Sequence, residues 1–317
     1  MKKLLIFISI LFLTLGVFAQ ANKSAQDYLE SGKVKYEEGK FQEALKDFNK
    51  AIELDPNNVE AYLKRASVKS GLIFDDTDIL KDCNKALELD PNNPKALINR
   101  GIIKVNLKKE EDAIDDFNKA LELLNEAIRL DPNNAEFYSD RARTKIGLKQ
   151  IDEGLEDLNK AIELDPKDSF SYVYRGATKA LYKKEYNEAI EDYNKAFELN
   201  SNDFRIYFLR GIAYKDLGEY EKALKDVNTG IKLSDSIQSN APYKVRVIIN
   251  FKSGRYFHVI ADLFNHILPK YVVVIIVLVL FLFICIFILI IKFIRRKYIA
   301  RREKKFLEEL KNYKQIK

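Results

Sequence analysis

Glu53-Leu54-Asp55-Pro56-Asn57-Asn58 decides the fold, because this stretch returns along the chain. It recurs, in full or with changes, around Leu89, Leu130 and Leu164, and in degraded form at Leu199-Asn200 and Leu233-Ser234. Leucine positions 54, 89, 130, 164, 199 and 233 give intervals of 35, 41, 34, 35 and 34 residues. A period near 34 indicates tandem helical hairpins. Such hairpins must stack, since none can bury its apolar face alone.

The charge of the chain is unevenly spread. Its 317 residues carry a net charge of +6, yet residues 292–317 contribute +8 from eleven Lys or Arg and three Glu. Lys2 and Lys3 add +2, so the rest of the chain carries −4. This mildly acidic remainder offers no basic face for nucleic acid, and we predict no nucleic-acid partner. Cys83 and Cys285 lie in different parts of the chain, so we predict no internal disulfide.

The N-terminal residues have the pattern of a secretory signal. Lys2 and Lys3 precede an apolar run from Leu4 to Phe18, and small residues follow it. We predict a signal peptide over residues 1–21, cleaved after Ala19 or Ala21. An uncleaved anchor is the alternative.

A second apolar run lies near the C-terminus. Tyr271 to Ile291 is a stretch of 21 uncharged residues. A helix of that length spans roughly 31 Å, which matches the hydrocarbon core of a bilayer. We predict a transmembrane helix over residues 269–291 and a basic cytoplasmic tail over residues 292–317, both in contact with membrane lipid. The expected location is a single-pass cell membrane protein with extracytoplasmic repeats, periplasmic if the source is bacterial.

Each repeat contains two amphipathic segments and a turn. In the first repeat we predict helices over residues 25–38 and 41–54, with Gly39-Lys40 between them. Three positions carry small residues, because closely crossing helices leave no room for large ones. The first holds Gly32, Ala66, Gly101, Ala142, Gly176 and Gly211; the second holds Ala44, Ile79, Ala113, Gly154, Ala189 and Ala223; the third holds Ala51, Ala86, Ala120, Ala161, Ala196 and Gly230. Only Ile79 departs from the rule.

This pattern resembles the tetratricopeptide repeat (TPR) family over about Ala25 to Leu233. The resemblance implies an all-α fold, a right-handed TPR solenoid of six to seven helical hairpins within residues 22–268. We place the units near 25–58, 59–93, 94–134, 135–168, 169–203 and 204–237, with a degenerate seventh at 240–268. An irregular helical stalk is the alternative for the seventh unit.

Arginine and aspartate recur with the same period. One first-helix position holds Arg65, Arg100, Arg141, Arg175, Arg210 and Arg246, and one second-helix position holds Asp47, Asp82, Asp116, Asp157, Asp192, Asp226 and Asp262. We predict a structural ladder of Arg–carboxylate pairs. Its register stays open, because pairing within a unit leaves out Asp47 and pairing with the next unit leaves out Asp262. An arginine row that binds an acidic ligand is the functional alternative.

The interval of 41 residues contains an apparent duplication of seven. Asn118-Lys119-Ala120-Leu121-Glu122-Leu123 is followed by the similar run Leu124 to Leu130. Seven residues make about two helical turns, so the apolar face stays nearly aligned. We predict one second helix about two turns longer than its peers.

The family resemblance implies a peptide groove lined by first helices. The candidate groove residues are Leu29, Leu63, Ile98, Ile102, Arg143, Val173, Phe208 and Ile212. They form a mainly apolar row that suits a protein or peptide segment with apolar anchors. Several of them could instead be covered by the neighbouring helix.

No catalytic motif, metal cluster or phosphate loop stands out, so we predict a protein that is not an enzyme and has no cofactor. The leading interpretation is a membrane scaffold that binds protein or peptide partners and supports complex assembly at the envelope. One alternative is a transmembrane signal transducer acting through the tail. Another is a non-catalytic subunit of an envelope enzyme.

Overall fold

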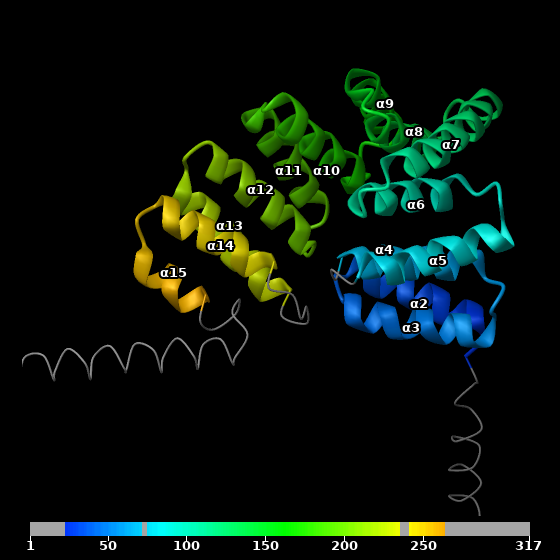
Figure 1. Ribbon diagram of the computed structural model, residues 1–317, viewed down its shortest axis with the longest axis horizontal. Helices are drawn as coiled ribbons and strands as arrows, with labels where there is room; N and C mark the ends of the chain where they lie inside the picture. Colours follow the sequence, from blue (N-terminus) through cyan, green and yellow to red (C-terminus); the bar gives the residue numbers. More distant parts are fainter. Residues whose placement is uncertain (1–22, 72–74, 235–240, 264–317) are drawn as a thin grey trace, which may run out of the picture. The chain divides into compact units, whose positions relative to one another are not determined.

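The computed structural model describes residues 23–71, 75–234 and 241–263 (Figure 1). The chain divides into two compact units, one ending at Arg255 and the other beginning at Tyr256. Within the described ranges every regular element is a helix, as the all-α prediction requires. The second unit contributes one described helix, α15 (Tyr256–Asp262), and the rest of the description concerns the first.

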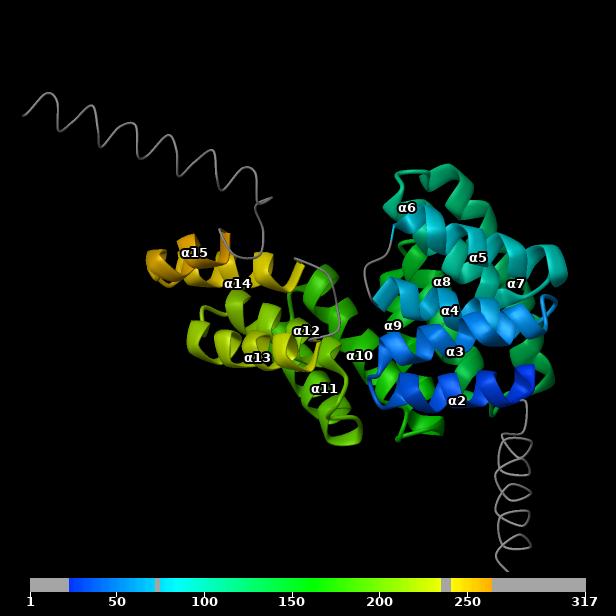
Figure 2. The same ribbon diagram turned by 90° about the horizontal axis from the view of Figure 1, so that it is seen from below.

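Helices of the first unit alternate between first and second members of a hairpin. The first helices are α2 (Ala25–Glu37), α4 (Val59–Gly71), α6 (Pro94–Asn106), α8 (Ala135–Gly147), α10 (Ser169–Thr178), α12 (Phe204–Asp216) and α14 (Ala241–Lys252). The second helices are α3 (Phe41–Leu54), α5 (Asp76–Leu89), α7 (Glu110–Leu130), α9 (Ile151–Leu164), α11 (Tyr186–Leu199) and α13 (Tyr220–Leu233). Figures 1 and 2 show α2 to α5 as two hairpins lying side by side.

The repeated Leu-Asp-Pro-Asn-Asn stretch forms each junction between hairpins. Asp90 follows the last residue of α5, and its carboxylate accepts a hydrogen bond from the Asn92 N–H at 3.2 Å. Asn93 caps α6 by accepting from the Ala96 N–H at 3.1 Å, and Pro94 takes the first helical position, where no N–H is needed. The motif therefore ends one helix and starts the next within a few residues.

Small residues make the close helix crossings. Gly32 in α2 is buried, and a Cβ there would lie 2.6 Å from the Phe48 ring of α3. A Cβ at Gly101 would likewise lie 2.7 Å from the Phe117 ring, and a Cβ at Gly176 would lie 2.9 Å from the Tyr193 ring. Where the first-helix residue is alanine, as at Ala66 and Ala142, the aligned second-helix residue is the smaller Cys83 or Leu158. In these five hairpins the size of the small residue matches the bulk of its partner, whereas in the sixth Gly211 lies against the smaller Val227.

The second helix of the third hairpin is the long one that the duplication predicts. Helix α7 has 21 residues, whereas α3 has 14. Both copies of the duplicated segment contribute to its buried face, through Ala120 from the first copy and Leu124 and Ile128 from the second. Adding seven residues therefore lengthens the buried face and does not rotate it away from the core.

The fifth hairpin carries one extra residue in its turn. The ladder residues Arg141 and Asp157 are 16 positions apart in the fourth hairpin, whereas Arg175 and Asp192 are 17 apart in the fifth. A π-helical segment over Lys179–Lys183 absorbs the addition, and Lys184 follows in the left-handed region at φ 59°. This turn leaves Leu181 72% exposed.

The interpretation as a single-pass membrane protein is contradicted. No helix within 23–71, 75–234 and 241–263 combines the length and apolar character that crossing a membrane requires. Even α7, with 21 residues, opens with Glu110, Glu111 and Asp112 and keeps a polar face. The predicted signal peptide at 1–21, the transmembrane helix at 269–291 and the tail at 292–317 all lie outside the described residues.

Candidate functional site

Five ladder arginines, from Arg65 to Arg210, bind the aspartate of their own hairpin through two nitrogens. In the fourth hairpin, Arg141 Nε donates to Asp157 Oδ2 at 2.8 Å and Nη2 donates to Oδ1 at 2.6 Å. The other pairs of the same form are Arg65–Asp82, Arg100–Asp116, Arg175–Asp192 and Arg210–Asp226. The carboxylates are buried, so this geometry replaces the water that they lose on folding.

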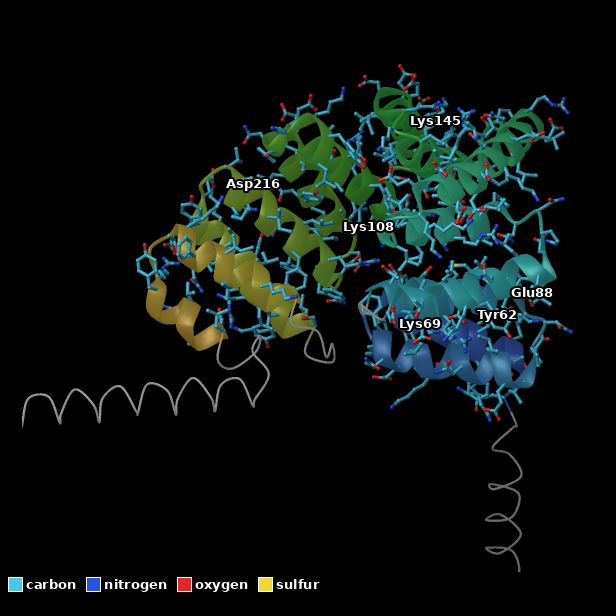
Figure 3. All side chains as sticks on the ribbon, in the orientation of Figure 1. Tyr62, Lys69, Glu88, Lys108, Lys145 and Asp216 are labelled. Atoms are coloured by element: carbon cyan, nitrogen blue, oxygen red, sulfur yellow. The ribbon has the colours of Figure 1, made fainter. Side chains whose placement is uncertain are left out.

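A lysine one turn further along the first helix approaches the same carboxylate. Lys145 Nζ lies 2.8 Å from Asp157 Oδ2, and Lys69 Nζ lies 2.7 Å from Asp82 Oδ2. Figure 3 labels these two lysines among the side chains of the first unit. Lys104 and Lys179 repeat the arrangement at Asp116 and Asp192. Each of these four buried carboxylates therefore faces two cations.

The third arginine nitrogen links each hairpin to the one before it. Arg175 Nη1 donates to Asn159 Oδ1 at 2.8 Å, and Arg210 Nη1 donates to Asn194 Oδ1 at 2.8 Å. The first hairpin has Ser31 in place of the arginine, and there Ser31 and Lys35 bind Asp47 at 2.7 Å and 2.6 Å. Among the described residues the arginines are thus occupied by protein partners, which favours the structural interpretation of the row over an acidic ligand.

The duplicated segment of α7 supplies the link to the fourth hairpin. Arg141 Nη1 donates to Asn125 Oδ1 at 3.0 Å, and Asn118, at the equivalent position of the first copy, is exposed. The second copy of the segment has therefore taken over the contact between hairpins.

We expect Asn125→Ala to lower the free energy of unfolding by about 1 kcal/mol, because it removes an acceptor from a charged donor. Asn118→Ala is the matched control, on the same helix and in the same local sequence, and should change stability by less than about 0.5 kcal/mol. Urea unfolding followed by far-UV circular dichroism measures both. Equal losses in the two variants would show that the register of α7 is wrong.

The eight candidate groove residues fall into two groups. Leu29, Leu63 and Ile98 are buried in the core, covered by neighbouring helices. Ile102, Arg143, Val173, Phe208 and Ile212 are partly buried. Helix α6 contacts α8, and α8 contacts α10, so these three first helices form a continuous face. We call the corresponding side of all the first helices the first-helix face. Its partly exposed apolar residues are available to a partner, and its buried ones are not.

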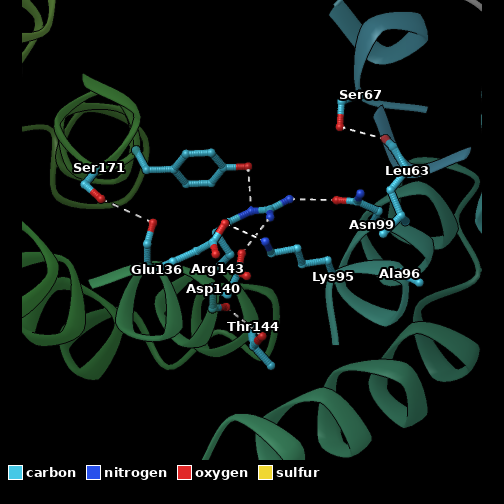
Figure 4. A network of polar contacts seen from close by, with 12 residues as sticks. Leu63, Ser67, Lys95, Ala96, Asn99, Glu136, Asp140, Arg143, Thr144 and Ser171 are labelled. Atoms are coloured by element: carbon cyan, nitrogen blue, oxygen red, sulfur yellow. Dashed lines mark hydrogen bonds and ion pairs between the residues drawn. The ribbon is translucent and has the colours of Figure 1, made fainter. Parts of the chain in front are cut away.

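Arg143 is the centre of a polar network across three first helices (Figure 4). Its Nη2 donates to Asn99 Oδ1 of α6 at 2.8 Å, and its Nη1 donates to Asp140 Oδ1 of α8 at 3.1 Å. Its Nε lies 3.3 Å from the Tyr174 hydroxyl oxygen of α10. The guanidinium also lies over the Phe170 ring, 5.6 Å from its centroid. Arg143 therefore joins helices of three successive hairpins.

The sequence analysis missed the partners of Arg143, although a signal for them exists. Asn99, Asp140 and Tyr174 all occupy the position just before the ladder arginine. Burial raises the pKa of Asp140, and the nearby charges of Arg143 and Lys95 oppose that rise. The network is satisfied internally, since no buried side-chain nitrogen or oxygen among the described residues lacks a hydrogen-bond partner. Arg143 thus holds α6, α8 and α10 together within the first-helix face.

Models of known protein families match most of the described hairpins. A TPR repeat model matches residues 32–70 and 179–218, and tetratricopeptide repeat models match residues 83–115, 115–173 and 204–236. The chain is built from tetratricopeptide repeats. The hairpins described above are the helical pairs of these repeats.

Solved structures of TPR proteins are similar to this chain. YrrB, described as a TPR protein with an unusual peptide-binding site, is 24% identical, with 59% of this chain and 91% of YrrB covered and a TM-score of 0.33. A TPR protein from Parabacteroides merdae is 18% identical, with 78% and 95% covered and a TM-score of 0.45. MamA is 22% identical, with 56% and 92% covered and a TM-score of 0.34. No curated protein matches the chain.

The TPR hairpins described here contain no cluster of three or more His, Cys, Asp or Glu side chains able to hold a metal ion. Cys83 is a packing residue of the second hairpin, fully buried beside Ala66, Ile79 and Ile103. Burial, reinforced by the charge of Asp82, raises the pKa of its thiol from 9.0 to about 12. Ile79, the one large residue at the small-residue positions, packs in the same cluster as this small side chain.

We expect Cys83 to resist thiol reagents in the folded TPR array, because both burial and the raised pKa withhold the thiolate. In a Cys285→Ser chain at pH 8, labelling should proceed only as fast as the second hairpin opens and should accelerate with urea. Measuring release of the chromophore from an aromatic disulfide reagent checks this. Rapid stoichiometric labelling without urea would contradict it.

Proposed function

We propose that the chain is a non-catalytic scaffold that binds a segment of another protein across its first-helix face. The observation that carries the proposal is the set of apolar side chains left partly exposed there, Ile102 on α6, Val173 on α10 and Ile212 on α12. They come from three different hairpins, so a single bound segment could contact all of them. A segment with spaced apolar anchors fits such a row.

The polar surroundings support the same partner chemistry. Lys33 forms ion pairs with Glu30 and Glu60, and Lys95 forms an ion pair with Glu136 at 2.5 Å. These charges of the first helices therefore pair with one another. Arg143 is held by Asn99 and Asp140. A surface whose charges are internally paired selects by apolar contact and shape more than by charge. We therefore propose an apolar-anchored peptide segment as the ligand.

A peptide-display selection against the full chain tests the proposal. Selected peptides should carry spaced apolar residues, and Val173→Glu should weaken their binding by about tenfold or more, because it places a charge in the apolar contact. Leu181→Glu is the matched control, since Leu181 is also apolar but lies in the π-helical turn of the same hairpin. Failure to select any peptide, or equal weakening by both variants, would refute the proposal.

A further inference from the structure

The first hairpin contacts the sixth, although about 160 residues separate them in sequence. The ring of Phe41, the first residue of α3, meets the ring of Phe204, the first residue of α12, edge-on at 5.4 Å between centroids. Tyr36 packs edge-on against Phe41 at 5.2 Å, and Phe208 against Phe204 at 5.6 Å. We call Tyr36, Phe41, Phe204, Arg205 and Phe208 the end clasp.

Arg205 fixes the clasp in place. Its guanidinium lies over the rings of Tyr36 and Phe41, 5.6 Å and 5.8 Å from their centroids. Its Nη1 lies 3.1 Å from the Tyr36 hydroxyl oxygen. Its Nε and Nη2 donate to the carboxylate of Asp203 at 2.8 Å and 2.7 Å. The cation is therefore held between rings of one hairpin and a carboxylate of the other.

Burial shows that this contact is particular to these two hairpins. Phe204 is 5% exposed, whereas Val59 and Ser169, at the same position in other hairpins, are only partly buried. Phe41 is 2% exposed, whereas Tyr220, its equivalent in the sixth hairpin, is partly buried. The clasp hides two aromatic rings that the repeat pattern alone would leave accessible.

The turn at Gly39 shows how closely the two hairpins approach. Gly39 has φ 75°, but Lys108 and Lys149 adopt φ 60° and 64° at the same turn position, so the conformation alone does not require glycine. At Gly39 a Cβ would lie 2.9 Å from the backbone oxygen of Asn202. At Gly218, the equivalent residue of the sixth hairpin, a Cβ would meet nothing within 4 Å. Close approach of the other hairpin is therefore a separate reason for glycine at position 39.

The cluster around the clasp includes two residues of the predicted groove. Leu29 of α2 and Phe208 of α12 both pack into the cluster that contains Phe41 and Phe204. Leu29 is buried, as its equivalents Leu63 and Ile98 are, so the clasp is not what covers it. Phe208 packs directly against the clasp ring of Phe204. Access to the rings of Phe41 and Phe204 requires the first and sixth hairpins to separate.

We propose that the end clasp is an autoinhibitory contact that opens to admit a protein segment to the rings of Phe41 and Phe204. This step rests on the proposed function. Opening leaves no stranded charge, because Arg205 and Asp203 both belong to the sixth hairpin and stay paired when water replaces the rings. The first hairpin loses the ring contacts of Phe41 and Tyr36, and the Tyr36 hydroxyl exchanges Arg205 for water. A ligand that binds only the open array shifts the population toward it.

Pulsed electron paramagnetic resonance on the full chain tests the clasp directly. Spin labels on Lys46→Cys and Lys225→Cys report the distance between the first and the sixth hairpin. Both lysines are exposed, and they occupy equivalent positions, each just before the ladder aspartate of its hairpin. Cys285→Ser removes a native thiol that could also take up the spin label, and the native Cys83 is buried. We expect a narrow distance distribution in this parent chain. Gly39→Lys should shift it to longer, broader distances, and the matched control Gly218→Lys should not.

Arg205→Ala provides a second variant that needs no new side chain in the turn, and it should widen the distances as well. Far-UV circular dichroism should show the helix content of the parent chain in all three variants. Unchanged distances in both Gly39→Lys and Arg205→Ala, or a broad distribution in the parent chain, would overturn the closed clasp.

The display-selected peptide separates the clasp from the proposed function. If the open state holds about a tenth of the population, Gly39→Lys should bind the peptide roughly tenfold more tightly than Gly218→Lys does. Equal affinities would overturn autoinhibition and leave peptide binding intact. Widened distances without any selectable peptide would confirm the opening but refute the proposed function, and with it the autoinhibitory role.

Discussion

Asp157→Ala should lower the free energy of unfolding by about 3 kcal/mol, the lower end of what breaking a buried ion pair costs. Asp157 has a side chain only 6% exposed, and its loss leaves Arg141 and Lys145 without their carboxylate. Their side chains are 19% and 18% exposed, so water compensates only in part. Urea unfolding followed by circular dichroism gives the difference from the parent chain.

Glu163→Ala is the control for this loss. Glu163 lies on the same helix and pairs with Lys160 at 2.8 Å, but the two side chains are 69% and 40% exposed. An exposed pair of this kind contributes less than about 1 kcal/mol. If Asp157→Ala were no more harmful than Glu163→Ala, the ladder would have no structural role.

Gly101→Ala should destabilise the array by about 2 kcal/mol, although alanine favours helix over glycine by about 1 kcal/mol. The new Cβ would lie 2.7 Å from the Phe117 ring. That ring is fully buried and also abuts Gly147 of the next hairpin, where a Cβ would lie 2.6 Å away. The ring has no free side to move toward, so the clash outweighs the gain in helix propensity.

A double-mutant cycle with Phe117→Leu checks the cause. Alanine opposite leucine is the combination that the fourth hairpin already uses at Ala142 and Leu158. The double variant should therefore lose less stability than the two single losses added together. Strict additivity would mean that the glycine is not there to make room for the ring.

The repeat period and the small residues predicted the hairpins well, because both follow from local physics. Glycine at position 101 and the junction at Asp90-Pro91-Asn92-Asn93 act within or between adjacent helices, where sequence distance and spatial distance agree. The extra length of α7 was predictable for the same reason, since a duplication of seven residues keeps the helix phase.

The site was harder to predict, because its contacts depend on which hairpin faces which. Periodicity gave the arginine and aspartate positions but left their register open, since an aspartate recurs on either side of every arginine. The clasp between Phe41 and Phe204 has no periodic signal at all, because it joins two hairpins that the repeat treats as distant. Leu29 seemed available to a ligand, but it is buried, as its equivalents Leu63 and Ile98 are.

The long helix α7 has a consequence for how such an array can change over evolutionary time. One additional heptad moves everything after it by about 10 Å along the helix axis, with almost no rotation. Asn125 then repeats the role that Asn118 would have had, so the later hairpins keep their old interfaces. Gain or loss of a heptad in a second helix is therefore a way to reposition half of a binding surface in one mutational event, with no need to redesign the joints.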